Sequence, residues 1–184
     1  PIKDLDSLPF PDKELFYSQV GYHNLVYTAI TGRGCPFHCT FCSNSAFKNL
    51  YGGPKPYIRR RSVDDVIEEV KRASSFGARV ILFHDECFTS NPQWLNEFAD
   101  RYRLEVGLPY LCWVHPNTIT PEVVRHLARS GCATAVLGVE SVDEHTRRKV
   151  MGRDTTDEQI QRAIRLVQEA GIALRVDFIV GVPG

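Results

Sequence analysis

The sequence predicts an α/β fold built around a parallel sheet. Five short, nearly continuous apolar runs alternate with longer stretches whose apolar residues recur at helical spacing. Strands of a parallel sheet are buried on both faces, so they read as unbroken apolar runs. Cysteine and polar residues follow the ends of these runs, at the edge where α/β sheets bind ligands. At 184 residues, the chain suits one domain with a sizeable core.

The first elements follow from local signals along the chain. Residues 1–22 are rich in Pro, Asp and Leu without a clear period, and we expect a linker or N-terminal extension there. A β-branched run at 25–31 predicts the first strand, which leads into a cysteine-rich loop. Ser62 is placed to cap a helix that Gly77 ends, and a strand at 79–84 follows.

The same alternation continues to the last residues. Pro92 suits the first turn of the next helix, and Thr120 with Pro121 is placed to begin the one after it. Gly131 and Gly171 are placed to end helices. The other expected strands span 110–114, 134–139 and 174–180, and the other helical stretches span about 91–106, 120–130, 143–150 and 156–170.

The two ends of the chain suggest a fragment. The first residue is Pro1, and the last strand runs directly into a turn at 181–184. A strand in such a sheet needs a covering helix, so we expect the core to continue beyond this chain. The expected organisation is an extension over 1–22 and a core over 23–184 that is incomplete at its C-terminus.

Composition gives no electrostatic case for two classes of partner. Lys+Arg and Asp+Glu both number 22, so the net charge is zero and nothing favours a nucleic acid or a membrane surface. No apolar run approaches the length of a membrane span. Cys87, Cys112 and Cys132 lie in or beside apolar runs, and we expect small buried side chains there.

Three cysteines, Cys35, Cys39 and Cys42, carry the strongest functional signal. Their C-x3-C-x2-C spacing suits three corners of a cubane iron–sulfur cluster. Electron-transfer clusters take four thiolates, so a three-cysteine loop leaves one iron open to a ligand. Zinc or buried free thiols are the alternatives, although zinc sites usually pair two C-x2-C halves or add histidine, and His38 lies between two of the proposed ligands. Phe41 is expected to keep water off the cluster.

This loop, with an aromatic residue before its last cysteine, resembles the signature of the radical SAM enzymes. The resemblance implies a partial (β/α)6 TIM-like barrel, truncated here before its last strand. It also implies a [4Fe–4S] cluster whose open iron binds S-adenosylmethionine (SAM). One electron then cleaves SAM to a 5′-deoxyadenosyl radical that abstracts a substrate hydrogen. Reduced thiolates imply a cytoplasmic protein, and a reductant such as flavodoxin or ferredoxin is the implied partner.

The second expected strand ends in His84-Asp85-Glu86, close to where the family binds the amino group of SAM. The family's usual glycines are absent here, and the form is similar to the Asp-Asp or Asp-Glu variant of the cobalamin-linked and methylthiotransferase-like branches. Strand alternation lets only one of the two acids face the barrel, and we favour Asp85 over Glu86. The alternative is an acid that stabilises a helix N-terminus.

Four more residues match contacts of this family. Glu140 and Ser141 end the fourth expected strand, where the family contacts the ribose and methionine parts of SAM, although a helix-capping pair would look the same. Arg153 matches an arginine that pairs with the cofactor carboxylate, and a solvated surface arginine is the alternative. Gly181 would let the backbone approach the adenine, or it is a plain turn glycine. His115 is a weaker candidate.

The opening residues look like the linker that follows a cobalamin-binding domain in one branch of the family. The resemblance therefore implies an enzyme, either a cobalamin-dependent methylase or a cyclase, whose cobalamin is held by a domain outside this chain. The alternatives are a methylthiotransferase-like or other cobalamin-free radical SAM enzyme, and a non-catalytic iron–sulfur electron-transfer module. No side chain is assigned to catalysis, and the small-molecule substrate stays unknown because loops and additions set specificity in such barrels.

Overall fold

The computed structural model describes residues 2–19 and 25–182. Its strands are β1 (Val26–Ala29), β2 (Gly32–Arg33), β3 (Arg59–Arg60), β4 (Val80–Phe83), β5 (Tyr110–Val114), β6 (Cys132–Glu140) and β7 (Ala173–Phe178). Its helices are α1 (Glu14–Tyr17), α2 (Ser43–Leu50), α3 (Pro54–Tyr57), α4 (Val63–Lys71), α5 (Pro92–Glu105), α6 (Pro121–Ser130) and α7 (Asp157–Glu169). Short 3₁₀ turns span Arg72–Phe76, Phe88–Ser90 and Pro116–Thr118, and a π-helical turn spans Thr146–Val150.

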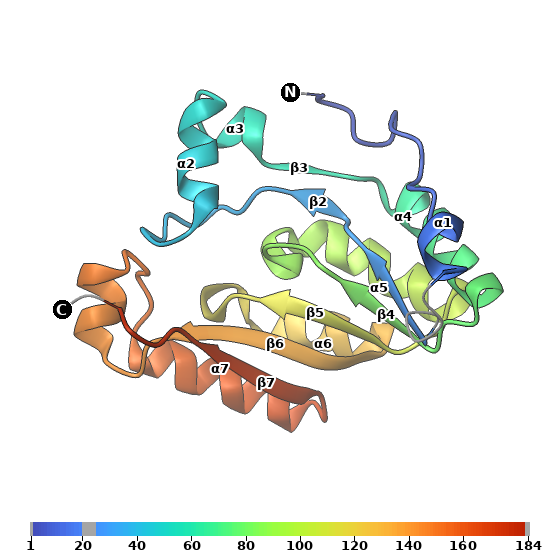
Figure 1. The fold of residues 1–184 in the computed structure, drawn as a ribbon. Coiled ribbons are helices and arrows are strands. Elements are labelled where there is room, and N and C mark those ends of the chain that lie inside the picture. The colour runs from blue at the N-terminus through green and yellow to red at the C-terminus, as the bar shows by residue number, and fades with distance from the viewer. Residues whose placement is uncertain (1, 20–24, 183–184) are drawn as a thin grey trace.

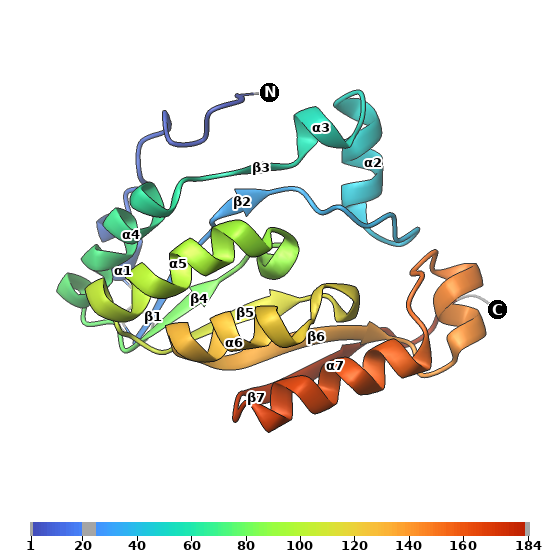
Figure 2. The same ribbon diagram turned by 180° about the vertical axis from the view of Figure 1, so that it is seen from behind.

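Five strands form one parallel sheet in the order β1-β4-β5-β6-β7. Each strand therefore pairs with the next one along the chain, as expected when a helix connects successive parallel strands. Helices α4, α5, α6 and α7 lie together on one side of the sheet (Figures 1 and 2). The predicted α/β class is confirmed, and the five strands form an open, partial barrel.

The core lies between the sheet and these four helices. Along β5, Tyr110, Cys112 and Val114 are buried, whereas Leu111 and Trp113 are half-buried. The strands are thus covered fully on the helix side and only partly on the other side. The three cysteines outside the loop are buried as predicted, at 2% exposed for Cys87, 0% for Cys112 and 7% for Cys132.

Most helix boundaries follow the local signals in the sequence. At the start of α4, the Ser62 side chain accepts a hydrogen bond from the backbone N–H of Asp65. At the start of α6, the Thr120 side chain accepts one from the backbone N–H of Val123. Each such cap typically stabilises a helix by about 1 kcal/mol. Gly77 and Gly131 adopt left-handed conformations directly after their helical stretches. These stops are confirmed because only glycine enters that conformation without a steric cost.

The structure differs from the sequence-based expectation in two segments. Between β1 and α4 the chain forms an antiparallel β2–β3 hairpin whose loop holds α2 and α3, and none of these was predicted. The expected helix at 143–150 becomes a π-helical turn at Thr146–Val150. Short elements of two to eight residues give too few periods for a sequence pattern to reveal them.

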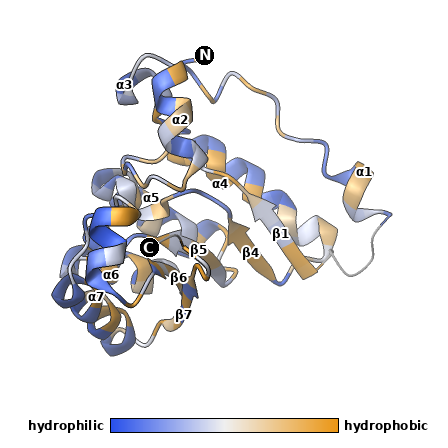
Figure 3. Cartoon of the chain, turned by 60° about the vertical axis from the view of Figure 1, so that its left-hand side comes forward, coloured by the Kyte–Doolittle hydropathy of each residue, from blue (hydrophilic) through white to orange (hydrophobic). Residues whose placement is uncertain are grey.

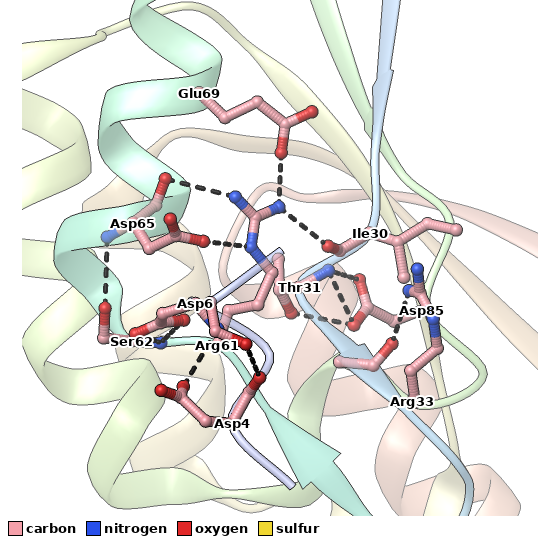
Figure 4. A network of polar contacts seen from close by, with 12 residues as sticks. Asp4, Asp6, Ile30, Thr31, Arg33, Arg61, Ser62, Asp65, Glu69 and Asp85 are labelled. Atoms are coloured by element: carbon pink, nitrogen blue, oxygen red, sulfur yellow. Dashed lines mark hydrogen bonds and ion pairs between the residues drawn. The ribbon is translucent and has the colours of Figure 1, made fainter. Parts of the chain in front are cut away.

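The N-terminal residues pack on the start of α4 (Figure 4). The Asp6 carboxylate accepts hydrogen bonds from the backbone N–H of Ser62 at 3.0 and 3.2 Å. Lys13 Nζ lies 2.7 Å from Glu69 Oε1, and Arg61 contacts the other oxygen of Glu69. The expected extension over 1–22 thus makes packed contacts in its described part, whereas residues 20–24 lie outside the described residues. Within 2–19 and 25–182, no helix is long and apolar enough to span a membrane.

Candidate functional site

The three cysteines lie in the loop that begins at the end of β2. Gly34, directly before Cys35, has φ +90°, and a side-chain carbon there would lie 2.9 Å from the Tyr57 ring and carbonyl. Only glycine fits this position, because other residues are strained at such angles and would also clash with Tyr57. Cys42 adopts an extended conformation as the N-cap of α2. The β2–β3 hairpin and α2 thus hold the two ends of the loop.

Contacts from two sides hold the loop in shape. Lys48, only 2% exposed, donates from Nζ to the Phe37 carbonyl, and Ser45 Oγ donates to the Cys39 carbonyl at 2.9 Å. From the far end of the sheet, the Met151 carbonyl accepts a hydrogen bond from the Thr40 backbone at 2.8 Å. The loop therefore bridges the elements that follow β1 and β6.

Two of the three sulfurs accept side-chain hydrogen bonds. Asn44 Nδ2 lies 3.4 Å from Cys42 Sγ, and its own Oδ1 accepts a bond from the Tyr57 hydroxyl. Arg153 Nη1 lies 3.5 Å from Cys39 Sγ. Donors at the sulfurs stabilise thiolates and tune bound iron, so this environment suits metal ligands.

The thiol of Cys35 is protonated in the metal-free protein at neutral pH. Burial raises its pKa to about 12, and the nearby Cys87, Cys39 and Cys42 add to the shift. A metal must therefore displace the proton before this sulfur can act as a ligand. Among the described residues, no group of three His, Cys, Asp or Glu side chains converges on a position for a single metal ion.

His115 lies against the cysteine loop. Its ring stacks on Phe37 with centroids 3.4 Å apart, and it is 5% exposed. Burial and the charge of Arg153 lower its pKa to about 2, so the ring is neutral. Nδ1 accepts a hydrogen bond from the Asn117 backbone at 3.2 Å, which assigns the proton to Nε2. This buried Nε2–H has no partner among the described residues.

The side chains of Glu140 and Arg153 both lie close to Gly138. Glu140 is the single non-glycine residue with positive φ, at +70°, in the part of the chain that the structure describes. A side-chain carbon on Gly138 would lie 2.3 Å from Glu140 Oε1 and 3.3 Å from Arg153 Nη2. Burial raises the pKa of Glu140, and the charge of Arg153 opposes that shift. Strained backbone of this kind concentrates at functional sites.

Arg153 is buried, which excludes the alternative of a solvated surface arginine. It is 6% exposed and donates from Nη2 to the Gly138 carbonyl at 2.5 Å. Its Nε is buried and finds no partner in the described residues. A buried guanidinium with an unused donor is suited to an anionic group of a ligand.

The two acids after β4 occupy different environments. The carboxylate of Asp85 accepts hydrogen bonds from the Thr31 backbone at 3.2 Å and the Thr31 hydroxyl at 2.7 Å (Figure 4). Burial raises its pKa, and the charge of Arg60 opposes the shift. Glu86 is exposed; burial raises the pKa of Tyr57 beside the cysteine loop, and the charge of Glu86 adds to that shift. Asp85 is thus held by Thr31 whereas Glu86 is exposed, and the preference for Asp85 as the acid facing a ligand stays a prediction.

The other predicted site residues lie as follows. Ser141 accepts a hydrogen bond from the Asp143 backbone at 3.2 Å, which matches the capping alternative. Gly181 has φ +83° with open space around it, so close approach of a ligand is sterically allowed. Phe41 is 45% exposed, and its expected shielding of a cluster stays a prediction. The ring packed inside the loop is Phe37. Cofactor contacts of these residues stay predictions.

Sequence reasoning missed several residues of this site. Asn44, Lys48 and Tyr57 support the loop from α2 and α3, and no motif marks them. Asn44 had one usable signal, since it lies two residues after Cys42 and can reach back to that sulfur. His115 was not missed, since its position after a strand end made it a weaker candidate in the sequence.

Residues 29–184 match the family model described as "Radical SAM superfamily". The chain belongs to this superfamily. The resemblance drawn from the cysteine loop is thus confirmed. Membership implies a [4Fe–4S] cluster, SAM and an external electron donor, and it indicates an enzyme.

Two relatives show which members of the superfamily are similar. An uncharacterized methyltransferase of Pyrococcus horikoshii is 29% identical over 188 residues, which cover 99% of this chain and 39% of that protein. The anaerobic magnesium-protoporphyrin IX monomethyl ester cyclase of Cereibacter sphaeroides is 28% identical over 195 residues, which cover 98% of this chain and 30% of that protein. The chain therefore spans about a third of the length of these relatives.

A solved structure shares the fold. The radical SAM methyltransferase TsrM of Kitasatospora setae, with tryptophan and a SAM analogue bound, superposes with a TM-score of 0.70 at 20% identity, covering 89% of this chain and 32% of that one. A second TsrM structure contains cobalamin and a [4Fe–4S] cluster. It superposes with a TM-score of 0.67 at 20% identity, covering 86% of this chain and 32% of that one.

Proposed function

We propose that this chain is the cluster- and SAM-binding core of a cobalamin-dependent radical methylase or cyclase. The single observation that carries the proposal is the cysteine loop, which lies at the C-terminal edge of the sheet beside a buried arginine with an unused donor. This arrangement fits a cluster with a ligand at its open iron. When bound and reduced, the cluster supplies the electron that cleaves SAM to methionine and a 5′-deoxyadenosyl radical.

Each polar residue of the site suits a part of SAM. In this proposal Arg153 pairs with the methionyl carboxylate through its Nε, which has no partner among the described residues, and Glu140 accepts hydrogen bonds from ribose hydroxyls. Glu86 suits the methionyl amino group better than Asp85, whose oxygens are already used by Thr31. The Gly138 carbonyl and Cys39 Sγ hold the Arg153 guanidinium in position before the cofactor binds, which reduces the cost of ordering it.

The branch assignment rests on the relatives. A methyltransferase and a cyclase match nearly the whole chain, and the similar TsrM fold was solved with cobalamin bound. The proposal therefore also includes cobalamin as a cofactor, methyl transfer or ring closure as the reaction, and a cytoplasmic location.

Anaerobic reconstitution tests the cluster. We expect about four irons per chain, as a cubane requires, and their loss when Cys35, Cys39 and Cys42 are replaced with alanine. Serine at Cys87, Cys112 and Cys132 is the matched control and should leave the iron content unchanged. Iron that survives the triple alanine change, or zinc as the only bound metal, would refute the proposal.

Addition of SAM tests the open iron. Saturating SAM should change the electron paramagnetic resonance (EPR) spectrum of the reduced cluster, and dithionite should yield 5′-deoxyadenosine, with S-adenosylhomocysteine as well in a methylase. An unchanged spectrum would favour the electron-transfer module instead.

Glu140→Gln tests the cofactor contact. Loss of a charged hydrogen bond costs about 1.5–3 kcal/mol, so we expect SAM affinity to fall roughly 10- to 150-fold with iron content unchanged. Anaerobic titration calorimetry measures this, with the exposed Glu122→Gln as control. Equal affinities of Glu140→Gln and the unaltered protein would leave Glu140 a helix-capping residue.

A further inference from the structure

The connection between β6 and α7 contains three consecutive cations in its π-helical turn. Arg147 is 0% exposed, whereas Arg148 and Lys149 are exposed. The turn closes where the Met151 N–H donates to the Thr146 carbonyl at 2.9 Å, and turns of this kind are frequent at functional sites. Figure 1 shows the turn in orange at the end of the sheet where the cysteine loop lies, and Figure 3 shows a hydrophilic stretch there that ends in hydrophobic residues. Arg147 is thus a fully buried charge close to the site.

The Arg147 guanidinium contacts three segments of the chain. Nη1 donates to the Ser141 carbonyl at 2.7 Å, directly after β6, and Nε donates to the Thr155 carbonyl at 2.9 Å. Nη2 lies 2.5 Å from Asp157 Oδ1 in the first turn of α7. Two backbone carbonyls and one carboxylate thus share one planar side chain, whose rigid fork holds several acceptors in a fixed geometry.

These contacts fix the backbone of Arg153 from both sides. The Arg153 N–H donates to the Arg147 carbonyl at 2.9 Å, and the Thr155 N–H donates to the Arg153 carbonyl at 2.8 Å. Because the Arg147 side chain also holds the Thr155 carbonyl, residues 147–155 form a closed hydrogen-bonded loop. The Arg153 side chain extends from this loop to Cys39 Sγ and the Gly138 carbonyl. The position of the Arg153 guanidinium in the site therefore depends on Arg147.

We infer that Arg147 is a positioning residue for SAM binding, which acts by holding Arg153 in place for the methionyl carboxylate. The inference rests on the proposed function, because that function assigns Arg153 to this carboxylate. Arg147 does not itself reach the cofactor, since its guanidinium is buried and bound to oxygens of the protein. Its anchor at Ser141 fixes the Arg153 loop to the end of β6, the strand that ends in Glu140.

Two physical arguments favour this role over simple support of the fold. Burial of a guanidinium costs free energy that its partners return only in part, and a well-packed apolar side chain often stabilises a protein equally well. Stability alone therefore does not require an arginine at this position. In contrast, a planar group with several donors is needed to hold the Ser141 and Thr155 carbonyls at once, and it thereby fixes the Arg153 loop relative to β6.

A double-variant cycle on the full-length, cluster-loaded protein tests the inference. Arg147→Met keeps most of the side-chain length and removes every donor. We expect SAM affinity, measured by anaerobic titration calorimetry, to fall roughly tenfold with iron content unchanged, which lies within the range of coupling in one hydrogen-bonded network. Arg153→Met should lower the affinity at least as much. The protein with both changes should bind SAM as Arg153→Met does, to within about twofold, because Arg147 acts through Arg153.

The matched control is Arg148→Met on the same turn, where the Arg148 side chain is 40% exposed. It should leave SAM affinity unchanged. Unchanged affinity in Arg147→Met would overturn the inference, and so would losses that multiply in the double variant, since the two arginines would then act independently. Loss of iron in Arg147→Met would also overturn it, because Arg147 would then support the cysteine loop.

Asp157→Ala is a second variant for the case that Arg147→Met does not fold. The Asp157 side chain is 55% exposed, so its removal should spare the fold while Nη2 of Arg147 loses its carboxylate. SAM affinity should fall roughly threefold, near the low end of the same range. Decarboxylated SAM lacks the group that Arg153 binds, so its affinity should not change. Equal losses for the two ligands would contradict a role through Arg153. Failure of the unaltered, iron-loaded protein to bind SAM would instead refute the proposed function.

Discussion

At the level of single residues, two side chains donate hydrogen bonds to the sulfurs of the cysteine loop. Asn44 and Arg153 each donate to one cysteine sulfur, and both side chains are at least nine-tenths buried. Donors to cluster sulfurs stabilise the reduced, more electron-rich state, so they raise the reduction potential. In the cluster proposed for this loop, these two residues would therefore make it easier to accept an electron.

Asn44→Ala should lower the reduction potential of the cluster. The variant loses one neutral hydrogen bond to sulfur, which is worth about 0.5–1.5 kcal/mol. An EPR-monitored potentiometric titration measures the shift, and Asn49→Ala, on the same helix and exposed, is the control. Identical potentials for the two variants would contradict the role assigned to Asn44.

His115 should make the metal-free protein less stable in mild acid. Its pKa is about 2 in the folded protein and 6.5 ordinarily, so below pH 6.5 the unfolded chain binds a proton that the folded protein does not. Stability therefore falls as pH decreases below 6.5, by at most about 1.4 kcal/mol per unit. His115→Asn keeps an acceptor for the Asn117 backbone and should flatten this dependence in urea unfolding at pH 7.5, 6 and 5. The control is the exposed His145→Asn, which should leave the pH dependence of stability unchanged.

At the level of elements, the β2–β3 hairpin decides where the cysteines lie. Gly32 pairs with Arg60 and Arg33 with Arg59, so the loop starts and ends at neighbouring positions. Arg60 then joins the hairpin to the end of β4, since it donates to the Thr31 hydroxyl at 2.8 Å and to Ser90 Oγ at 3.0 Å. Asp85 completes this group, which explains why its carboxylate faces the hairpin.

Gly34→Ala should abolish iron binding, whereas Gly52→Ala should not. Both glycines have positive φ, so alanine costs roughly 1–3 kcal/mol at either position. At Gly34 the new carbon also meets Tyr57 at 2.9 Å, whereas at Gly52 nothing lies within 4 Å. The clash must displace Cys35 or α3. Iron analysis after reconstitution checks this, and equal iron content in the two variants would show that the loop tolerates the displacement.

In the whole molecule, one buried carboxylate joins three segments. Glu69 on α4 is 2% exposed and contacts both Lys13 of the N-terminal segment and Arg61 after β3. Burial lowers the pKa of Lys13, and the charge of Glu69 opposes that shift. Both cations depend on this acid, so it links the N-terminal segment to the site.

Glu69→Gln should destabilise the protein far more than Glu68→Gln. Removal of one partner leaves two buried charges poorly compensated, which costs roughly 3–5 kcal/mol. Glu68 is 69% exposed and lies 3.6 Å from Arg72, a surface pair worth about 0–1 kcal/mol. Urea unfolding compares the two variants. A loss below 1 kcal/mol for Glu69→Gln would mean that water or Asp65 replaces the missing charge.

The sequence alone determined the class of fold and the order of the main elements, and it named the three cysteines as candidate metal ligands. Apolar periodicity and capping residues act over a few neighbouring positions, so they are visible in the chain itself. The cysteine spacing is equally local, and it led to the superfamily that the comparisons confirm.

Only the tertiary structure decided which side chains meet. It turned Asp85 toward Thr31, left Phe41 exposed and placed His115 against Phe37. It also buried Arg153 beside Cys39, 114 positions away in the chain. Such contacts depend on how the hairpin and the connection after β6 pack across the sheet edge, and no local pattern records that packing.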